Sequence, residues 1–282
     1  MKNIFVAGAG VMGLDIALEF AKAGMDVTVR DINDEIIERA RQRLEDTLDR
    51  LTAKGKLSEG GAEDLRGRIR FTVDMAPARG ADLVLEAIVE RADLKISVFR
   101  ELDALCGPEC IFCSNTSSIS ITQMAAASGR PDRFIGMHFF NPPAVMKLVE
   151  VTRALTTSDG TFRAVRGLCL RLGKEPVEVQ DSPGFVVNRL LVPMMNEAVF
   201  LLSEGAASAE DIDRSMQLGA NHPMGPLHLA DLVGLDVVLH VCDVLYDETK
   251  DPKFRACYLL RKMVRAGKLG RKTGEGFFTY RQ

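Results

Sequence analysis

Short apolar runs alternate with amphipathic helical segments over the first part of the chain. Runs typical of buried strands stand at residues 2–7, 26–30, 68–73, 82–87, 110–114 and 176–180. Between them, apolar side chains recur at helical spacing over residues 14–23, 33–56 and 91–105. Strands that alternate with helices are typical of an α/β fold built on a mostly parallel sheet.

The pattern changes near residue 182. Asp181–Gly184 contains a proline and a glycine, and from Phe185 to Glu204 the apolar positions follow helical spacing. Either Ser182 caps that helix with Pro183 at its first position, or Pro183 marks the turn before the helix. The sequence therefore predicts an α/β domain, residues 1–182, followed by an all-α C-terminal domain, residues 183–282.

The predicted C-terminal domain contains more apolar surface than one small bundle buries. Leu227–Leu245 is apolar around most of its helical circumference. An apolar helix face without a partner in its own chain favours association. We therefore expect a homodimer through the C-terminal helical domain.

Composition narrows the class of protein. The 282 residues are 46% hydrophobic and 27% charged with a net charge of −3, which argues against nucleic-acid binding. The longest uncharged run, Cys110–Gly129, is rich in polar residues, so we expect no membrane span. The cysteines show no disulfide-scaffold spacing, and although Cys110 and Cys113 form a C-x-x-C, they lie in a predicted strand with no histidine near, which indicates reduced thiols, a cytoplasmic protein and no metal.

A glycine-rich turn follows the first predicted strand and opens a helix. Its residues are Gly8, Gly10, Val11, Met12 and Gly13, in a G-x-G-x-x-G pattern. In this context the glycines permit a tight turn and close approach of a pyrophosphate to the helix N-terminus. Asp31 ends the second strand, where an acid binds a ribose 2′-hydroxyl, so a Rossmann-like domain that binds NAD is predicted. Arg30 leaves some use of NADP open.

Polar residues follow two further predicted strands. Glu90 and Lys95 come after residues 82–87, and Asn115–Ser118 follows residues 110–114. Open α/β sheets bind ligands at the carboxyl ends of their strands, so these residues are candidates for a site. The tetrapeptide Asn115–Ser118 suits a turn that caps the next helix equally well.

Each of the two apolar runs within Phe134–Val151 contains one ionisable residue. His138 and Glu150 each lie in a run of strand character, on either side of a loop at Asn141. A carboxylate behind an imidazole fixes its tautomer and raises its basicity, as an enzyme that removes a hydroxyl proton requires. The alternative is a buried structural histidine beside an unrelated glutamate.

Two helical positions are also candidates. The basic residues at the end of the helix 33–56 either complement the helix dipole or bind a phosphate-rich substrate. Asn188 lies among apolar neighbours in the predicted helix Phe185–Glu204, where it either caps the helix start or points into a site.

These segments together resemble the L-3-hydroxyacyl-CoA dehydrogenases, especially the short single-function form that acts on 3-hydroxybutyryl-CoA. The resemblance covers essentially the whole chain. It rests on Gly8–Gly13, Glu86–Glu90, Ser114–Ser118, His138–Pro142, Val145–Val151, Asp181–Leu191, Pro223–Pro226 and Lys272–Phe277.

The resemblance implies an acyl-CoA substrate, NAD as cofactor and a role for each matching residue. It makes His138 the base in alcohol oxidation and the acid in ketone reduction, with Glu150 holding it. Ser117 and Asn188 would bind the reacting end of the substrate. Positions that touch NAD in the family are matched by Glu90, Lys95, Ser117, Asn141 and Lys272, and positions near the CoA moiety by Thr47 and Lys54.

Two other functions remain open from sequence. A relative of the same fold would oxidise a free hydroxy acid such as L-gulonate, but would not need the basic helix end. A non-catalytic NAD(H)-binding protein would not need His138 and Glu150. Acyl-chain length, the physiological direction and the pathway, with fatty-acid metabolism among the candidates, do not follow from the sequence.

Overall fold

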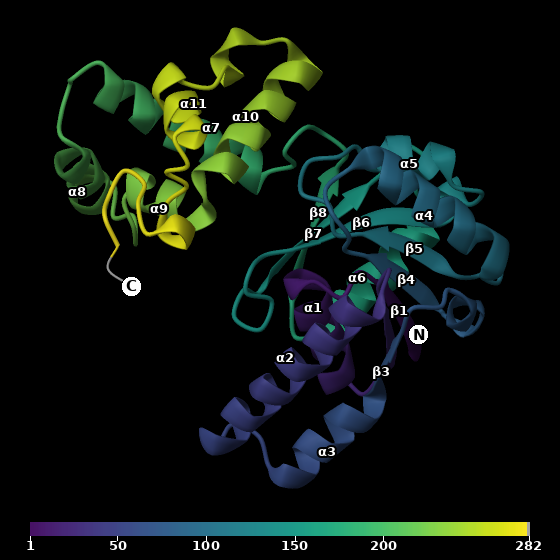
Figure 1. Cartoon of the computed structure of the whole chain (residues 1–282). Helices are drawn as coiled ribbons and strands as arrows, with labels where there is room; N and C mark the ends of the chain where they lie inside the picture. The colour runs from purple at the N-terminus through teal and green to yellow at the C-terminus, as the bar shows by residue number, and fades with distance from the viewer. Residues whose placement is uncertain (281–282) are drawn as a thin grey trace. The chain divides into compact units, whose positions relative to one another are not determined.

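The chain forms two compact units. The computed structural model describes residues 1–280; the first unit spans Met1–Asp181 and the second begins at Ser182. Each unit has its own buried apolar core, and each is described by itself below (Figure 1).

One sheet forms the centre of the first unit. Within the described residues its order is β3-β2-β1-β4-β5-β6-β7-β8. The strands are β1 (Asn3–Ala7), β2 (Asp26–Arg30), β3 (Ile69–Thr72), β4 (Leu83–Glu86), β5 (Ile111–Ser114), β6 (Phe134–Phe139), β7 (Leu148–Arg153) and β8 (Glu175–Gln180). Neighbouring strands are parallel except β6 and β7. The strand order reverses between β1 and β4, where open α/β sheets bind ligands.

Helices cover both faces of this sheet. They are α1 (Val11–Lys22), α2 (Asp34–Ala53), α3 (Glu59–Arg68), α4 (Ala92–Leu105), α5 (Ile121–Ala127) and α6 (Asp159–Arg171). α1, α2, α3 and α6 share one core cluster with alternate strand residues. α4 packs on the other face through the Phe99 ring, which lies 5.4 Å from the ring of Phe112 and 4.6 Å from that of Phe134. Figure 1 shows α4 beside α5.

The predicted fold class is confirmed, but the sequence pattern did not reveal α3. This helix contains Gly60, Gly61 and Gly67, which lower helix propensity. It forms because Ser58 caps it, accepting a hydrogen bond from the Gly61 N–H at 3.1 Å, and because it buries Leu65.

The second unit is helical. It contains α7 (Val187–Ser203), α8 (Ala209–Gly219), α9 (Pro226–Val233), α10 (Leu235–Thr249) and α11 (Tyr258–Arg265). α7 packs against α9, α10 and α11. The helix starts at Val187 because Gly184 and Phe185 have positive φ angles of 73° and 50°, outside the helical region. Pro183 therefore marks the turn before the helix.

Two features of composition can be compared with the structure. Across residues 1–280, no helix has both the length and the apolar character that a membrane crossing requires. All six cysteines are free thiols and buried.

Candidate functional site

The glycine turn joins β1 to α1 and packs against the end of β4. Gly8 has a φ of +113°, and a Cβ there would stand 2.5 Å from the Ala87 carbonyl oxygen. A Cβ on Gly13 would collide with the Gly8 carbonyl oxygen. On Gly10, by contrast, a Cβ would meet no atom within 4 Å. The turn is thus tightly packed on both sides of Gly10 and open at Gly10.

This open space suits the pyrophosphate of a dinucleotide. Gly10 is the N-cap of α1, and Val11 and Met12 begin the helix. The first N–H groups of a helix have no partner within it and lie at the positive end of the helix dipole. An anion over Gly10 would meet these groups without a side chain in the way.

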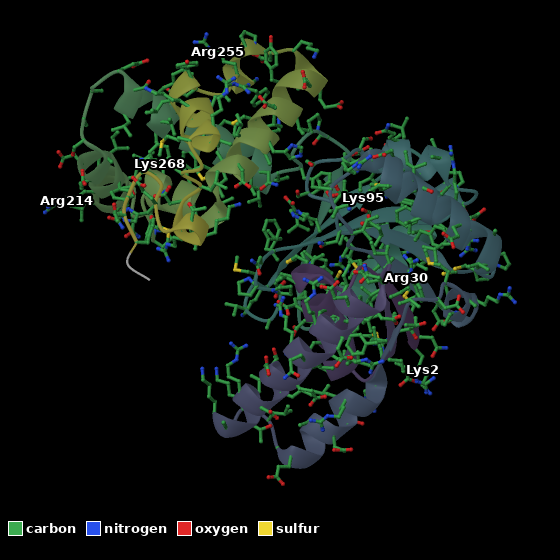
Figure 2. The ribbon with its side chains drawn as sticks, viewed as in Figure 1. Lys2, Arg30, Lys95, Arg214, Arg255 and Lys268 are labelled. Carbon is green, nitrogen blue, oxygen red and sulfur yellow. The ribbon has the colours of Figure 1, made fainter. Side chains whose placement is uncertain are left out.

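Asp31 fixes the turn from the neighbouring strand. Its Oδ2 accepts a hydrogen bond from the Ala9 N–H at 2.7 Å, and its Oδ1 accepts one from the Ile32 N–H at 2.7 Å. The Arg30 guanidinium donates to the Val73 carbonyl oxygen at 3.2 Å, so its side chain reaches the end of β3 (Figure 2). Asp31 therefore lies beside the turn, where a ribose would follow the pyrophosphate.

His138 and Glu150 form a buried pair. The antiparallel register of β6 and β7 places them directly opposite each other. The His138 Nδ1 lies 2.8 Å from the Glu150 Oε2, and the imidazole packs against the Phe140 ring at 4.5 Å. Because a carboxylate accepts hydrogen bonds, this contact assigns the proton to Nδ1 and leaves Nε2 as the basic nitrogen.

Glu86, Glu90 and Lys95 form a second group of charges, called here the charge cluster, in which the Glu90 side chain is 29% exposed. Glu86 ends β4 and is 0% exposed. Lys95, which is labelled in Figure 2, lies on α4 and is 1% exposed. The Lys95 Nζ lies 2.6 Å from the Glu86 Oε1 and 3.1 Å from the Glu90 Oε2. A buried lysine requires such partners because an uncompensated charge is costly away from water.

The cluster shifts the pKa values of its two carboxyl groups in opposite directions. Burial raises the pKa of Glu86 above its usual value, even though Lys95 and Ser114 act against this. Burial alone would also raise the pKa of Glu90, but Lys95 and the hydrogen bond from Thr116 outweigh it, so the pKa of Glu90 is lowered. Glu90 is therefore an ionised acceptor at neutral pH.

Glu90 holds the segment that carries Ser117. Its Oε1 accepts hydrogen bonds from the Thr116 hydroxyl at 2.5 Å and from the backbone N–H groups of Ser117 and Ser118 at 3.0 and 3.2 Å. The Asn115 Oδ1 accepts one from the Phe139 N–H at 2.9 Å. The Ser117 segment is thereby fastened to both the charge cluster and the end of β6.

The first unit thus brings most of the predicted site residues to one edge of the sheet. The glycine turn, Glu90, Ser117 and His138 lie at the carboxyl ends of β1, β4, β5 and β6. Asn141 follows β6 and is exposed.

Other predicted residues lie away from these contacts or in the second unit. Thr47 lies on α2 and Lys54 follows its last turn, where the lysine is exposed. Asn188 is in the first turn of α7. Lys272 forms an ion pair with Asp236 at 2.5 Å, in the second unit.

Sequence reasoning assigned no role to Glu86. The signal was present, because a glutamate ends the otherwise apolar strand Leu83–Glu86 and a lysine follows at Lys95. It also left open whether Asn115–Ser118 is a turn or a site. In the structure the Thr116 Oγ1 accepts a hydrogen bond from the Ile119 N–H at 3.0 Å, as in a turn, and the Ser117 N–H donates to Glu90 at 3.0 Å.

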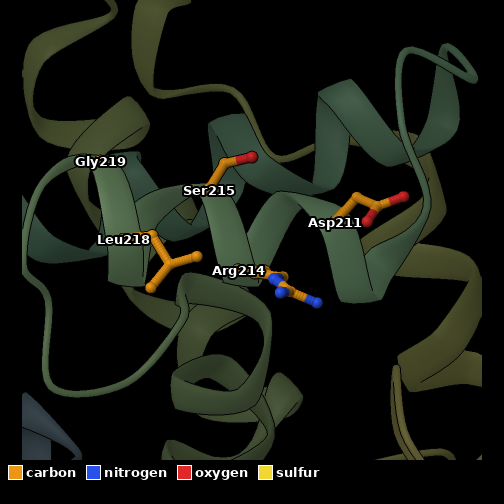
Figure 3. A pocket seen from close by; sticks show the side chains of 5 residues that line it. All are labelled: Asp211, Arg214, Ser215, Leu218 and Gly219. Carbon is orange, nitrogen blue, oxygen red and sulfur yellow. The ribbon is translucent and has the colours of Figure 1, made fainter.

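A surface hollow on the second unit contains none of these residues. It is lined by one side of α8 (Figure 3), through Asp211, Arg214, Ser215, Leu218 and Gly219. Asp211 accepts a hydrogen bond from the Ser208 hydroxyl at 2.9 Å at the helix start.

Known proteins match the chain over its whole length. Residues 3–182 match the family model of the 3-hydroxyacyl-CoA dehydrogenase NAD binding domain, and residues 184–280 match that of the C-terminal domain. A probable 3-hydroxybutyryl-CoA dehydrogenase of Bacillus subtilis is 49% identical, covering 100% of this chain and 98% of the relative. The mouse mitochondrial hydroxyacyl-coenzyme A dehydrogenase is 43% identical, covering 100% and 92%.

A solved structure gives the same result. The (S)-3-hydroxybutyryl-CoA dehydrogenase of Ralstonia eutropha superposes with a TM-score of 0.96 at 48% identity and 100% coverage of both chains. The chain is therefore an NAD-dependent oxidoreductase with a Rossmann-like domain. It belongs to the 3-hydroxyacyl-CoA dehydrogenase family.

The open space at Gly10 gives a first test. We expect Gly10→Val to weaken NADH binding by about tenfold or more, since a side chain there occupies the pyrophosphate position. The fold should persist because a Cβ at Gly10 meets no neighbour. Fluorescence titration of NADH measures the effect, and Gly67→Val, at another open position on α3, is the control. Equal affinity for Gly10→Val and wild type would contradict this site.

Proposed function

We propose that this protein oxidises L-3-hydroxybutyryl-CoA to the 3-oxoacyl-CoA with NAD, and catalyses the reverse reduction. The observation that carries the proposal is the buried His138–Glu150 pair, with Nδ1 and Oε2 at 2.8 Å. It occurs in a chain whose relatives in Bacillus subtilis and Ralstonia eutropha have names that specify 3-hydroxybutyryl-CoA.

His138 is the proposed acid–base group. With Nδ1 donating to Glu150, Nε2 takes the proton of the 3-hydroxyl during oxidation and returns it to the 3-oxo group during reduction. The imidazolium forms next to the Glu150 carboxylate, which stabilises its charge and keeps the ring oriented. Bound NAD supplies the hydride acceptor for C3.

The glycine turn and the edge of the sheet are the proposed cofactor site. Gly8, Gly10 and Gly13 keep the turn narrow, and the N–H groups at Val11 and Met12 bind the pyrophosphate. Asp31 accepts hydrogen bonds from the ribose. The remaining proposed contacts come from the family resemblance and are Glu90, Lys95, Ser117, Asn141 and Lys272.

Three further groups complete the proposal. Ser117 and Asn188 hydrogen-bond the reacting end of the substrate and orient it against His138. The CoA moiety binds at the end of α2, where Thr47 is half-buried and Lys54 is exposed. Cations at Arg50, Lys54 and Lys56 would bind the phosphate groups of CoA, whereas a small free acid has no phosphate groups for them to bind.

The second unit is the proposed dimerisation surface. It exposes large apolar side chains, among them Leu190 at 71%, Leu232 at 49% and Val237 at 43%. Side chains of this kind on neighbouring helices are typical of an interface between copies of one chain.

Replacing the proposed base tests the mechanism. We expect His138→Gln to lower kcat for acetoacetyl-CoA reduction by about two to four orders of magnitude, because proton transfer loses its positioned group. NADH affinity should stay within about threefold, since the loss is one of chemistry rather than cofactor binding. Stopped-flow and NADH titration measure the two quantities. The control is His240→Gln, which replaces an exposed histidine on α10. A near-normal kcat for His138→Gln would contradict the assignment of His138 as the acid–base group.

Replacing a cation tests the CoA position. Lys54→Gln should raise the KM for acetoacetyl-CoA by about three- to tenfold and leave kcat nearly unchanged, because it removes binding that is equal in ground and transition state. Raising the salt concentration should narrow the difference from wild type. The exposed Lys250→Gln variant is the control. An unchanged KM would remove Lys54 from the substrate site.

Sedimentation velocity tests the dimer. At micromolar concentration we expect a mass of two chains, because the exposed apolar side chains of the second unit are buried between copies. Substituting Leu190, which is 71% exposed, with Asp should shift the protein towards one chain. A wild-type protein that sediments as a single chain would contradict the dimer.

A further inference from the structure

We propose that Lys174 is a positioning residue that holds the loop between β6 and β7 against α1. This loop, residues 140–147, carries Asn141 and joins the strand of His138 to the strand of Glu150. The inference rests on the proposed function in one respect, namely that Asn141 contacts NAD. It assigns a role to a buried cation outside both the His138–Glu150 pair and the charge cluster.

The end of α6 fixes the backbone of Lys174. Gly173 has a φ of +69°, a conformation that glycine adopts without strain and that ends a helix. The Lys174 N–H then donates to the Cys169 carbonyl oxygen at 3.0 Å, and the Glu175 N–H donates to the Lys147 carbonyl oxygen at 2.8 Å. Lys174 therefore stands between the end of α6 and the residue where β8 meets the end of the loop.

The side chain of Lys174 is directed into the protein and is 6% exposed. An ammonium group has three donors. The Nζ donates to the carbonyl oxygen of Pro143 and to that of Met146 at 3.2 Å. It also lies 3.1 Å from the Glu19 Oε2 on α1. Its donors are thus shared between two carbonyl groups of the loop and one carboxylate of the helix.

The loop gains its attachment from these two carbonyl groups. Pro142 and Pro143 have no backbone N–H to donate. The Pro142 carbonyl oxygen accepts hydrogen bonds from the N–H groups of Val145 at 2.9 Å and Met146 at 3.0 Å, which closes a turn. The Val145 and Met146 residues are 71% and 40% exposed, so apolar burial holds this turn only weakly. The bonds from Lys174 fasten it to the unit.

Glu19 connects the lysine to the helix that begins at the glycine turn. It lies within α1, whose N-cap is Gly10, and its side chain is 10% exposed. Its Oε1 accepts a hydrogen bond from the Lys22 Nζ at 2.8 Å. Lys174 thus links the loop of Asn141 to α1. Because Glu19 keeps Lys22 when Lys174 is replaced, its carboxylate is not left without a cation, and the fold should persist.

Hydrogen exchange without cofactor tests whether Lys174 holds the loop. In Lys174→Met the carbonyl groups of Pro143 and Met146 lose their donor and turn to water. The amides of Val145 and Met146 should then exchange about tenfold faster or more than in wild type. Unchanged exchange at these amides would overturn the proposal. If Lys174→Met does not fold, Lys174→Gln, which keeps two N–H donors on a shorter side chain, gives the same comparison.

Arg130 provides a matched control because it is also a buried cation that fastens a loop. Its guanidinium donates to the carbonyl oxygens of Gly107 at 2.6 Å and Cys110 at 3.2 Å, and pairs with Asp103 at 2.7 Å. That loop precedes β5, at the amino end of the strand and away from the candidate site. Arg130→Met should speed exchange at the Cys110 amide and leave the NADH Kd within about twofold of wild type.

NADH titration tests whether the loop acts through Asn141. Lys174→Met alone should weaken NADH binding by about three- to tenfold, because Asn141 loses its fixed position. In an Asn141→Ala background the same change should alter the NADH Kd by less than about twofold. No loss in wild type, or equal losses in both backgrounds, would overturn action through Asn141.

The two measurements separate this inference from the proposed function. An Asn141→Ala variant that binds NADH as tightly as wild type would contradict the proposed contact between Asn141 and NAD. Exchange at Val145 and Met146 would still decide whether Lys174 holds the loop, because it is measured without cofactor or substrate.

Discussion

Buried charge is the constraint on which the edge of the sheet depends. His138, Glu150, Glu86 and Lys95 are all at most 6% exposed, in a unit whose core is largely apolar. Away from water each of these groups requires a partner at hydrogen-bond distance, and the partners come from different strands and helices. Their hydrogen bonds therefore join β4 to α4 and β5, and β6 to β7.

The antiparallel direction of β7 is a second constraint on the candidate site. In a purely parallel sheet, residues on neighbouring strands would reach the edge that carries the candidate site only at their carboxyl ends. Because β7 runs antiparallel to β6, Glu150 near its start comes to lie opposite His138 near the end of β6. A shift of one residue in this register would turn Glu150 to the other face of the sheet. The geometry of the proposed acid–base pair is thus a property of strand pairing.

Much of this could be predicted from the sequence because its signals are local. Apolar runs located the strands, and the glycines of the turn stood between a strand and a helix, so the class of domain followed. α3 was missed because its glycines oppose its helical periodicity. The pairing of Glu86 with Lys95 was missed for a different reason: their contact depends on how α4 packs on the sheet, which no local pattern records.

The comparison that tests the account most directly uses wild-type protein and NADH. Initial rates of NADH oxidation are measured with acetoacetyl-CoA and with free acetoacetate. The initial rate of NAD reduction is measured with L-gulonate. If the basic end of α2 binds CoA and His138 serves the thioester, kcat/KM for acetoacetyl-CoA should exceed that for acetoacetate by about a hundredfold or more, because binding energy from the remote nucleotide lowers the barrier. Comparable values for both, or turnover of L-gulonate alone, would contradict the account.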